Sequence, residues 1–403
     1  MSELIQQLVE MEFGYQLLLG AVLLFLFIQL YYYFYYFAAP IRKLKKDFST
    51  KSSGKRPNVS IIVCAQNEQE NLQAFIPKLL SQKYSAKFEV VVVNDGSTDD
   101  SIDVLERLAQ EHSNLKISFL PKAAKYMSRK KMCLSIGIKA AAYDTLVFTD
   151  ADCKPTSDLW LDSIARHHSN ENNVVLGASR VEKTEGMIGE LIDYDNLFST
   201  MQYMGYAICG NPFRGTILNL SYTKGVYYKA KGFSQHLNLE SGEDDIILND
   251  ANVQNAEVEL SAGSIIVSNR ALTPNSYRHA KEQRLDNKKR YSTSIRTSLF
   301  IERASRMLFY LTTLVAILLL GISTQWVGFG IAVLAFLLRY LVQYYVLSNN
   351  SKWLGTPNHP FGQIFFDFYL PIYEFYINTI GRIGRKKWGN VEGITATAPL
   401  LWL

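Results

Sequence analysis

The sequence predicts an α/β fold, in which a large domain built on a mostly parallel sheet is flanked by transmembrane helices. Between residues 57 and 300, short apolar runs alternate with stretches of helical periodicity, and three of these runs end in polar residues. Long apolar stretches lie before and after this region. With 403 residues, 48% of them hydrophobic, the chain can bury a large core and hold more than one domain.

The first apolar stretch, residues 15–37, holds no charge and is long enough to cross a bilayer. The residues before it, MSELIQQLVEME, are acidic, which argues against a cleaved signal peptide. It ends in a Tyr/Phe belt followed by the basic sequence IRKLKKDFSTKSSGKR, and such flanks mark the cytoplasmic side. We therefore predict a transmembrane anchor over residues 1–40, with the N-terminus outside, and a basic juxtamembrane linker over residues 41–56.

Four apolar runs in the middle of the chain predict the strands of one sheet. They are VSIIVCAQNE (59–68), FEVVVVNDGS (88–97), LKISFLP (115–121) and TLVFTDADC (145–153). Stretches such as ENLQAFIPKLLSQ, which has helical periodicity, separate them. This βαβ alternation is typical of a mostly parallel sheet.

Polar residues stand where three of these strands end, at Gln66-Asn67-Glu68, Asn94-Asp95 and Asp150-Ala151-Asp152. Sheets of this kind bind ligands beyond the carboxyl ends of their strands. In an extended strand, residues two apart point to the same side, so the carboxylates of Asp150 and Asp152 converge. Because like charges repel, we expect a divalent cation or a cation–diphosphate complex between them.

Other kinds of site do not suit the spacing of the residues. The chain has no G-x-G-x-x-G fingerprint and no G-x-x-x-x-G-K-[ST] phosphate loop. An aspartyl-phosphate phosphatase wants Thr or Val where Lys154 stands, and DADCKP lacks the glycine and further oxygen ligands of a calcium loop. The four cysteines form neither a C-x-x-C pair nor a zinc spacing, and a net charge of +5 is too mild to imply nucleic-acid binding.

Five motifs, in this order, resemble those of the membrane-anchored family 2 glycosyltransferases, inverting GT-A enzymes that include cellulose-synthase-like and chitin-synthase-like proteins. They are VCAQNEQENL, VVVNDGSTDDS, TDADC, GEDDIIL (242–248) and NKKRY (287–291), the last an imperfect match to Q-x-x-R-W. The resemblance covers residues 57–300 and implies a Rossmann-like GT-A domain there.

The resemblance implies which residues hold the donor. Glu68 and Asp95 would bind the base and ribose of a nucleotide sugar, for which a UDP-sugar is the expected donor. Lys130 occupies the family's lysine position near the nucleotide, and Lys131 is its rival for that role.

The acidic motifs would hold the metal and supply the base. By resemblance, Asp150 would lie near the ribose and Asp152 would ligate Mg²⁺ or Mn²⁺ bridging the diphosphate. An acceptor hydroxyl needs a base to take its proton, and Asp244 is the predicted base, with Glu243 beside it and Asp245 as the substitute. Three consecutive acids also suit the N-terminus of a helix, which is the structural alternative.

In NKKRY, Asn287 and Tyr291 replace the family's Gln and Trp, while Arg290 remains. By resemblance these residues would contact the donor diphosphate and the acceptor, and Arg290 can still neutralise a leaving phosphate. The altered motif puts processive synthesis in doubt. The alternative is that these cations face anionic lipid beside the membrane.

Two further apolar stretches, Met307–Ser323 and Trp326–Leu347, predict a transmembrane hairpin over residues 301–348. Arg339, inside the second stretch, is costly there unless it faces protein or snorkels. Residues 361–380 carry Asp367 and Glu374 and precede the basic sequence GRIGRKKWGN. We therefore predict that residues 349–403 form an interfacial helix and a cytosolic tail.

Together these features predict a multi-pass protein of the inner (cytoplasmic) membrane with its catalytic domain facing the cytosol. The predicted activity is inverting transfer of a sugar from a nucleotide-diphospho-sugar to a lipid-linked or growing polysaccharide acceptor, without nucleic acid. The alternative is a non-catalytic nucleotide-sugar-binding subunit of a polysaccharide synthesis complex. Replacement of Asp244 separates the two, because only an enzyme would lose transfer while it keeps donor binding.

Overall fold

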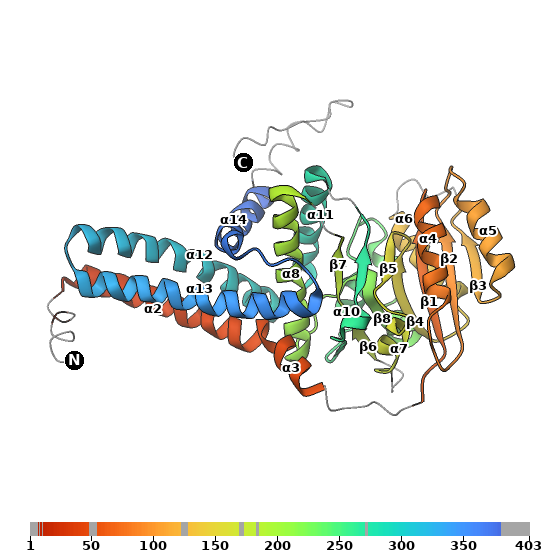
Figure 1. Cartoon of the computed structure of the whole chain (residues 1–403), viewed down its shortest axis with the longest axis horizontal. Coiled ribbons are helices and arrows are strands. Elements are labelled where there is room, and N and C mark those ends of the chain that lie inside the picture. Colours follow the sequence, from red (N-terminus) through yellow and green to blue (C-terminus); the bar gives the residue numbers. More distant parts are fainter. Residues whose placement is uncertain are drawn as a thin grey trace.

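The computed structural model describes residues 7, 9, 11–47, 55–121, 128–168, 173–182, 185–270 and 273–379. A bundle of long helices lies at one end of the molecule and an α/β domain at the other (Figure 1). Between them stand α8 (Gly186–Ile208) and α11 (Pro274–Asn287). The site therefore has to be sought both in the sheet and where the sheet meets these connecting helices.

The main sheet has seven strands in the order β3-β2-β1-β4-β8-β6-β9. Their bounds are β1 Val59–Ala65, β2 Phe88–Asn94, β3 Leu115–Phe119, β4 Thr145–Asp150, β6 Val174–Leu176, β8 Leu220–Thr223 and β9 Glu257–Val258. The four predicted strands are confirmed as a parallel block, and β8 is antiparallel to both β4 and β6. Cα pairing sets Ala65 opposite Asn94 and Cys64 opposite Asp150, so the predicted strand ends meet at one edge.

Helices cover both faces of this sheet, because alternate strand residues point to opposite sides. Ile61 packs in one core with α4 (Gln69–Leu80), α5 (Ser101–Glu111) and α7 (Trp160–Ala165), and Ile62 in the other with α6 (Arg129–Ala140). Two short helices, α9 (Lys224–Lys229) and α10 (Ile246–Asp250), complete the domain. A side chain at Gly137 of α6 would meet Ile62 Cγ2 at 2.5 Å, so only glycine lets α6 pack this closely on the sheet.

A second sheet of three strands has the order β5-β10-β7, with β5 Cys153–Pro155, β7 Ser179–Val181 and β10 Ile266–Ser268. Strand β10 pairs antiparallel with β5 and parallel with β7. A hydrogen bond joins this sheet to the turn that carries Asp152, because the backbone N–H of Asn269, directly after β10, donates to the Asp152 carbonyl at 2.8 Å.

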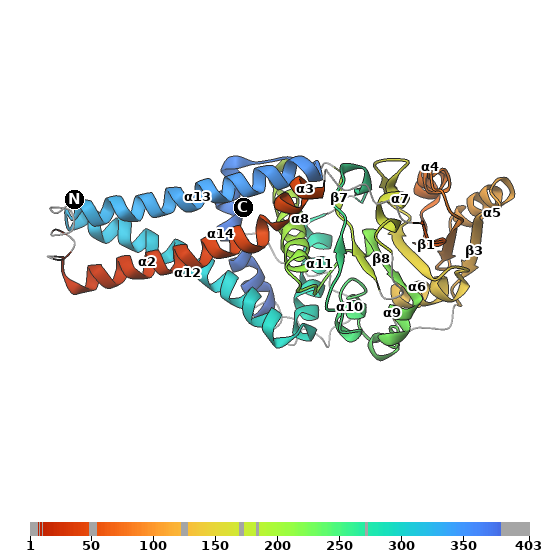
Figure 2. The ribbon, with the colours of Figure 1, turned by 90° about the horizontal axis from the view of Figure 1, so that it is seen from below.

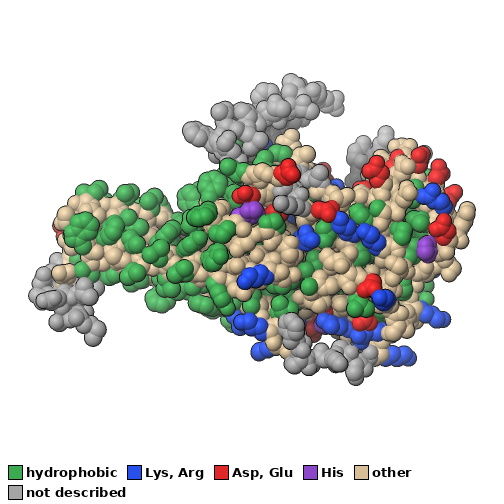
Figure 3. All heavy atoms as spheres, viewed as in Figure 1, with side chains coloured by type: hydrophobic (Ala, Val, Ile, Leu, Met, Phe, Trp, Pro, Cys, Tyr) green, Lys and Arg blue, Asp and Glu red, His purple; other side chains and the backbone are tan. Residues whose placement is uncertain are grey.

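The bundle contains α2 (Phe13–Tyr32), which continues through a π-helical turn (Tyr33–Phe37) into α3 (Ala39–Asp47), together with α12 (Thr293–Ile322) and α13 (Trp326–Leu354). Within the described residues, three helical segments are long and apolar enough to cross a membrane: Phe13–Lys46, α12 and α13. Hydrophobic side chains cover the bundle, whereas charged ones gather over the α/β domain (Figure 3). Helix α12 begins at Thr293, before the predicted apolar stretch. Its first turns lie near the end of α11.

Helix α14 (Pro360–Asn378) runs across the bundle rather than along it (Figure 2). Its outward face exposes large apolar side chains at Phe361, Phe365, Phe368, Ile372 and Phe375. These positions recur at helical spacing, as expected for a helix that lies in a membrane interface. The predicted basic tail, residues 380–403, lies outside the described residues.

Arg339, whose charge is costly inside an apolar stretch, faces protein rather than lipid. Its guanidinium is buried and pairs with Asp367 of α14 at 2.7 Å, and it also donates to Gln29 Oε1 of α2 at 3.0 Å. Arg306 of α12 pairs with the other Asp367 oxygen at 2.9 Å. One carboxylate thus ties α14 to two helices of the bundle.

Candidate active site

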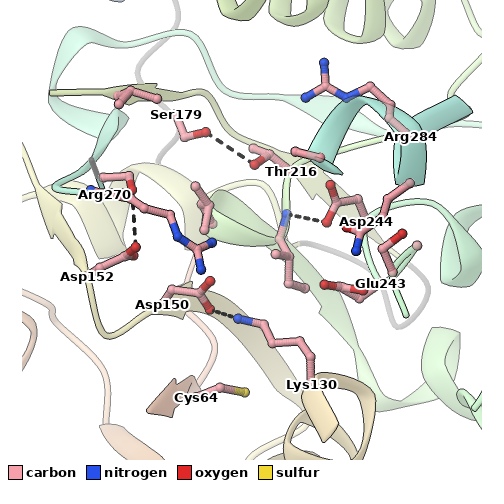
Figure 4. Close-up of a pocket in the computed structure, with 18 of the residues that line it drawn as sticks. Cys64, Lys130, Asp150, Asp152, Ser179, Thr216, Glu243, Asp244, Arg270 and Arg284 are labelled. Carbon is pink, nitrogen blue, oxygen red and sulfur yellow. Dashed lines mark hydrogen bonds and ion pairs between the residues drawn. The ribbon is translucent and has the colours of Figure 1, made fainter. Parts of the chain in front are cut away.

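A cavity of about 590 Å³ opens at the carboxyl ends of β1, β2 and β4 (Figure 4). Its opposite wall comes from α8, α11 and the loop of residues 241–245. Eight predicted site residues line it: Glu68, Asp95, Lys130, Asp150, Asp152, Glu243, Asp244 and Asn287. The fold thus brings residues from all five motifs and the α6 lysine to one space.

The first two strand-end loops lock onto each other. Asn67 adopts a left-handed conformation, with φ of 53°, which asparagine tolerates better than most residues. Its Oδ1 accepts a hydrogen bond from the Thr98 backbone N–H at 2.8 Å. Glu68 follows at the cavity edge and accepts from Asn71 Nδ2 at 2.6 Å. Burial raises the pKa of Glu68, against the lowering effect of Asn71.

Two cations from the start of α6 pair with the strand-end aspartates. Arg129 pairs with Asp95, and Lys130 pairs with Asp150. Burial lowers the pKa of Lys130, but Asp150, Cys64 and Glu243 together outweigh burial and the pKa is raised. The ammonium group therefore stays charged within the cavity, where an incoming phosphate would meet it.

The Asp152 carboxylate is suited to be a metal ligand. Its Oδ1 accepts only from the Cys153 thiol at 3.1 Å, and its Oδ2 only weakly from Ser268 Oγ at 3.5 Å, so no described cation occupies this carboxylate. Among the described residues, no three His, Cys, Asp or Glu side chains are grouped as metal ligands. Mg²⁺ and Mn²⁺ suit such a site, because they prefer oxygen and Mg²⁺ commonly takes one or two carboxylates plus substrate phosphates.

Glu243 and Asp244 stand across the cavity from Asp150 and Asp152 (Figure 4). Asp244 Oδ1 accepts from the Ile217 backbone N–H at 3.2 Å, and its Oδ2 lies 3.9 Å from Arg214 Nη2. Its side chain keeps 28% of its surface exposed. Asp244 is therefore oriented by the backbone and still open to the cavity.

The three consecutive acids lie close together, with Asp245 buried and Glu243 and Asp244 partly buried. Burial and the Asp244 charge raise the pKa of Glu243 to about 7. Burial raises the pKa of Asp245 to about 7 as well, against the lowering effect of Arg214. The pKa of Asp244 is also raised by burial and opposed by Arg214. Carboxyl groups with pKa values moved toward neutrality are suited to proton transfer.

Only part of the last motif, NKKRY, lines the cavity. Asn287 lines the cavity and donates to Ser241 Oγ at 3.3 Å. Tyr291 does not line it: the ring is buried, and its hydroxyl donates to Asp245 Oδ2 at 2.6 Å. Arg290, also outside the lining, donates to Asn287 Oδ1 at 3.4 Å. Tyr291 thus contacts an acid of the site rather than the open space in which a sugar would stack.

Lys131, the rival of Lys130, points elsewhere. Its buried Nζ donates to the backbone carbonyls of Leu239 at 2.6 Å and Ser241 at 2.8 Å. It therefore holds the loop that leads to Glu243, while Lys130 points into the cavity.

Of the residues that α11 contributes to the lining, the prediction included only Asn287. Tyr277, Lys281 and Arg284 line the cavity from successive turns of this helix. The Tyr277 hydroxyl and Lys281 Nζ both donate to Asp195 of α8, at 3.1 Å and 2.6 Å. The spacing of four and three residues is the signal in the sequence, because it places all three on one helix face.

Comparison with known proteins agrees with this site. Residues 60–213 match the family described as Glycosyl transferase family 2. Glycosyltransferase AglE of Haloferax volcanii is 32% identical over 108 residues, which cover 26% of this chain and 34% of that protein. The poly-beta-1,6-N-acetyl-D-glucosamine synthase of Staphylococcus aureus is 23% identical over 162 residues, covering 38% of each.

A solved structure shares the fold. The mannosyltransferase of Pyrobaculum calidifontis, determined in complex with GDP-Man and Mn²⁺, superposes with a TM-score of 0.52 at 14% identity, over 93% of this chain and 100% of that one. The alignments with the two curated relatives span only about a third to two fifths of their length. The chain thus matches the family 2 glycosyltransferase model over residues 60–213 and has a GT-A-like fold, with three long apolar helices beside it.

Proposed function

We propose that this chain is an inverting glycosyltransferase that moves a sugar from a nucleotide-diphosphate sugar to a lipid-linked or growing glycan acceptor at the cytosolic membrane face. One observation carries the proposal. Inside a family 2 domain, the Asp150–Asp152 pair at the end of β4 faces Asp244 across a single cavity. The donor and its displacing nucleophile would meet in that space.

The donor would lie along the strand ends. Glu68 and Asp95 border the part of the cavity suited to a nucleoside, and Lys130 offers a charge to the diphosphate. Asp152 would hold Mg²⁺ or Mn²⁺, which supplies positive charge to the leaving diphosphate. A UDP-sugar is the expected donor, and GDP is tested beside it because the solved mannosyltransferase holds GDP-Man.

The transfer step needs one base and one displacement. The acceptor oxygen forms a bond to the anomeric carbon as the bond to the diphosphate oxygen breaks, and that electron pair leaves with the diphosphate. Asp244 takes the hydroxyl proton on the face opposite the leaving group. Attack from that face inverts the anomeric configuration. Lys130 remains protonated throughout and offsets charge on the departing phosphate.

The membrane helices support an acceptor that is amphiphilic or held at the bilayer. Three candidate spans anchor the domain, and α14 lies across them with an exposed apolar face. A cytosolic domain follows from the basic flank after the first span.

Thermal stabilisation of the purified full-length protein by UDP, GDP and CDP, each with and without Mn²⁺, tests the donor site. We expect a metal-dependent rise in the midpoint for one nucleotide, lost in Asp152→Asn. Asp144→Asn is the matched control, because Asp144 is an exposed acid just before the other end of β4. Absence of any nucleotide effect in folded wild-type protein would overturn the donor site.

A further inference from the structure

A second cavity, of about 490 Å³, lies between the end of α11, the first turns of α12 and the last residue of α14. Four cations line it: Lys288, Lys289, Arg296 and Arg303. No described Asp or Glu side chain is part of its lining. The cavity is therefore electropositive and stands where the α/β domain meets the candidate spans.

The nearby carboxylates do not balance this charge. Glu374 lies behind the cavity and pairs with both Lys288, at 3.3 Å, and Arg303, at 2.6 Å. The same carboxylate also pairs with Lys281 at 3.0 Å. No ion pair joins Arg296 to a carboxylate of the described chain. Lys289 pairs with the exposed Asp286 at 3.4 Å, so Arg296 is the lining cation that pairs with no described carboxylate. An anion entering the cavity would thus meet Arg296 beside cations that share two carboxylates.

The cavity is also apolar on its membrane side. Leu285 and Leu299 are buried in its wall, whereas Phe300 stands 70% exposed at its rim. From Phe300, the exposed side chains of Leu311 and Leu318 continue along the same face of α12 into the candidate span. Intervals of 11 and 7 residues keep these positions on one side of a helix. A ligand that fits both features has an anionic head and a long apolar chain.

Tyr291 separates this cavity from the donor cavity. It lines the second cavity, and its hydroxyl donates to Asp245, which lines the first. Lys288 of the second cavity directly follows Asn287 of the first. An anion among these cations would therefore sit one side chain away from the acids at residues 243–245.

We propose that the second cavity binds the phosphate of a membrane-anchored acceptor in which a lipid phosphate carries a sugar, while a hydroxyl of that sugar reaches the donor cavity. This assignment rests on the proposed function and names its acceptor class. The cations hold the phosphate while the apolar chain lies along α12 in the bilayer.

Binding is measured on the full-length protein in bilayer discs of zwitterionic lipid. The probes are farnesyl phosphate, farnesol, which has the same chain without the phosphate, and inorganic phosphate, which has no chain. Wild type is expected to bind farnesyl phosphate at least about tenfold more tightly than either of the others. Equal binding of inorganic phosphate would overturn the lipid assignment, and equal binding of farnesol would overturn the role of the cations.

Variants locate the site. Lys289→Gln/Arg296→Gln removes two exposed cations and should weaken farnesyl phosphate binding about tenfold or more. Lys45→Gln is the control, because Lys45 is an exposed cation on the other basic segment, α3. Phe300→Ser should weaken farnesyl phosphate binding but leave inorganic phosphate unchanged. Unaltered farnesyl phosphate binding in the double variant would overturn the proposal.

Nucleotide binding in the same samples separates this inference from the function on which it rests. Wild type that is stabilised by a nucleotide and Mn²⁺ but does not bind farnesyl phosphate would overturn the lipid-phosphate cavity alone. Wild type that is stabilised by no nucleotide would overturn the donor site itself.

Discussion

The donor cavity has two halves that are held together differently. The donor half, at the ends of β1, β2 and β4, is fixed by contacts between residues 20 to 34 positions apart, such as Lys130–Asp150 and Arg129–Asp95. The membrane half, on α8, α11 and the loop of residues 241–245, depends on contacts such as Lys281–Glu374, which joins α11 to α14 across 93 positions. The residues of the donor half lie in short sequence motifs, whereas the membrane half forms only when helices distant in the sequence pack together.

The halves also differ in what one substitution does. Strand-end side chains face a solvent-accessible cavity, so replacing one changes binding or chemistry more than folding. In the membrane half, Asp367 and Glu374 each pair with two or more cations in a buried position. Removing one such carboxylate leaves uncompensated buried charges. Variants of the two halves should therefore separate activity from stability.

The largest expected effect is on turnover in Asp244→Asn. The amide cannot accept the acceptor proton, so transfer should fall by about 10²- to 10⁴-fold. Nucleotide stabilisation with Mn²⁺ should remain, because Asp244 lies across the cavity from Asp152, the proposed metal ligand. Nucleotide release from the sugar donor measures the loss, and Asp250→Asn, at the exposed end of α10, is the control. Turnover above a tenth of wild type would argue against Asp244 as the base.

Asp367→Asn should cost stability rather than chemistry. Arg339 and Arg306 would lose the carboxylate that pairs with both, a change that typically costs about 3–5 kcal/mol. Thermal unfolding in detergent measures it, with Asp286→Asn as the surface control, for which a change within about 0.5 kcal/mol is expected. An unchanged midpoint would show that this pairing does not hold α14 to the bundle.

Arg214→Gln should move the pH dependence of transfer. The Arg214 cation lowers the pKa of both Asp244 and Asp245, against the raising effect of burial. Without it these pKa values rise, so the base is protonated over more of the acidic range. The acidic limb of kcat/KM should shift to higher pH, with the rate lost first at low pH. Arg270 also lines the cavity, on the donor side, where its charge lowers the pKa of Glu68. Arg270→Gln should weaken donor binding without moving the limb, and equal shifts in both variants would refute the assignment.

The smallest expected effect is at the start of α11. Thr273 Oγ1 accepts from the Ser276 backbone N–H at 3.2 Å in a capping box. Thr273→Ala should cost about 1 kcal/mol of unfolding free energy, whereas Thr273→Asn should cost less because asparagine also caps helices. Chemical denaturation of the two variants measures the difference. An equal loss in both would mean that the cap contributes nothing to the membrane half.

The sequence was informative for the donor half because its signals are local. Apolar runs followed by polar residues predict strand ends, and parallel pairing brings those ends to one edge whatever the rest of the chain does. The motifs therefore predicted four strands and eight cavity-lining residues. The resemblance favoured Lys130 near the nucleotide and left Lys131 as its rival; in the structure Lys130 lines the cavity, whereas Lys131 donates to the Leu239 carbonyl.

The antiparallel part of the sheet and the membrane half of the cavity were harder to predict from the sequence, for physical reasons. Strands of two to four residues, such as β6, β8 and β9, are too short to show a period, so the antiparallel part of the sheet was not predicted strand by strand. The contacts of Arg284 and Lys281 with Asp195 join segments 86 to 89 residues apart. Tyr291 was predicted to bind a ligand, yet its hydroxyl reaches Asp245, a contact that the motif alone does not reveal.

We propose that the sugar is transferred by a single displacement within one cavity, with Asp244 as the base. The most direct test is the anomeric configuration of the first product formed from an α-linked nucleotide sugar, read by proton NMR before the anomers equilibrate. Inversion requires a β-configured product, formed by wild type and not by Asp244→Asn. An α-configured product would contradict it, because retention requires a second displacement or a different mechanism.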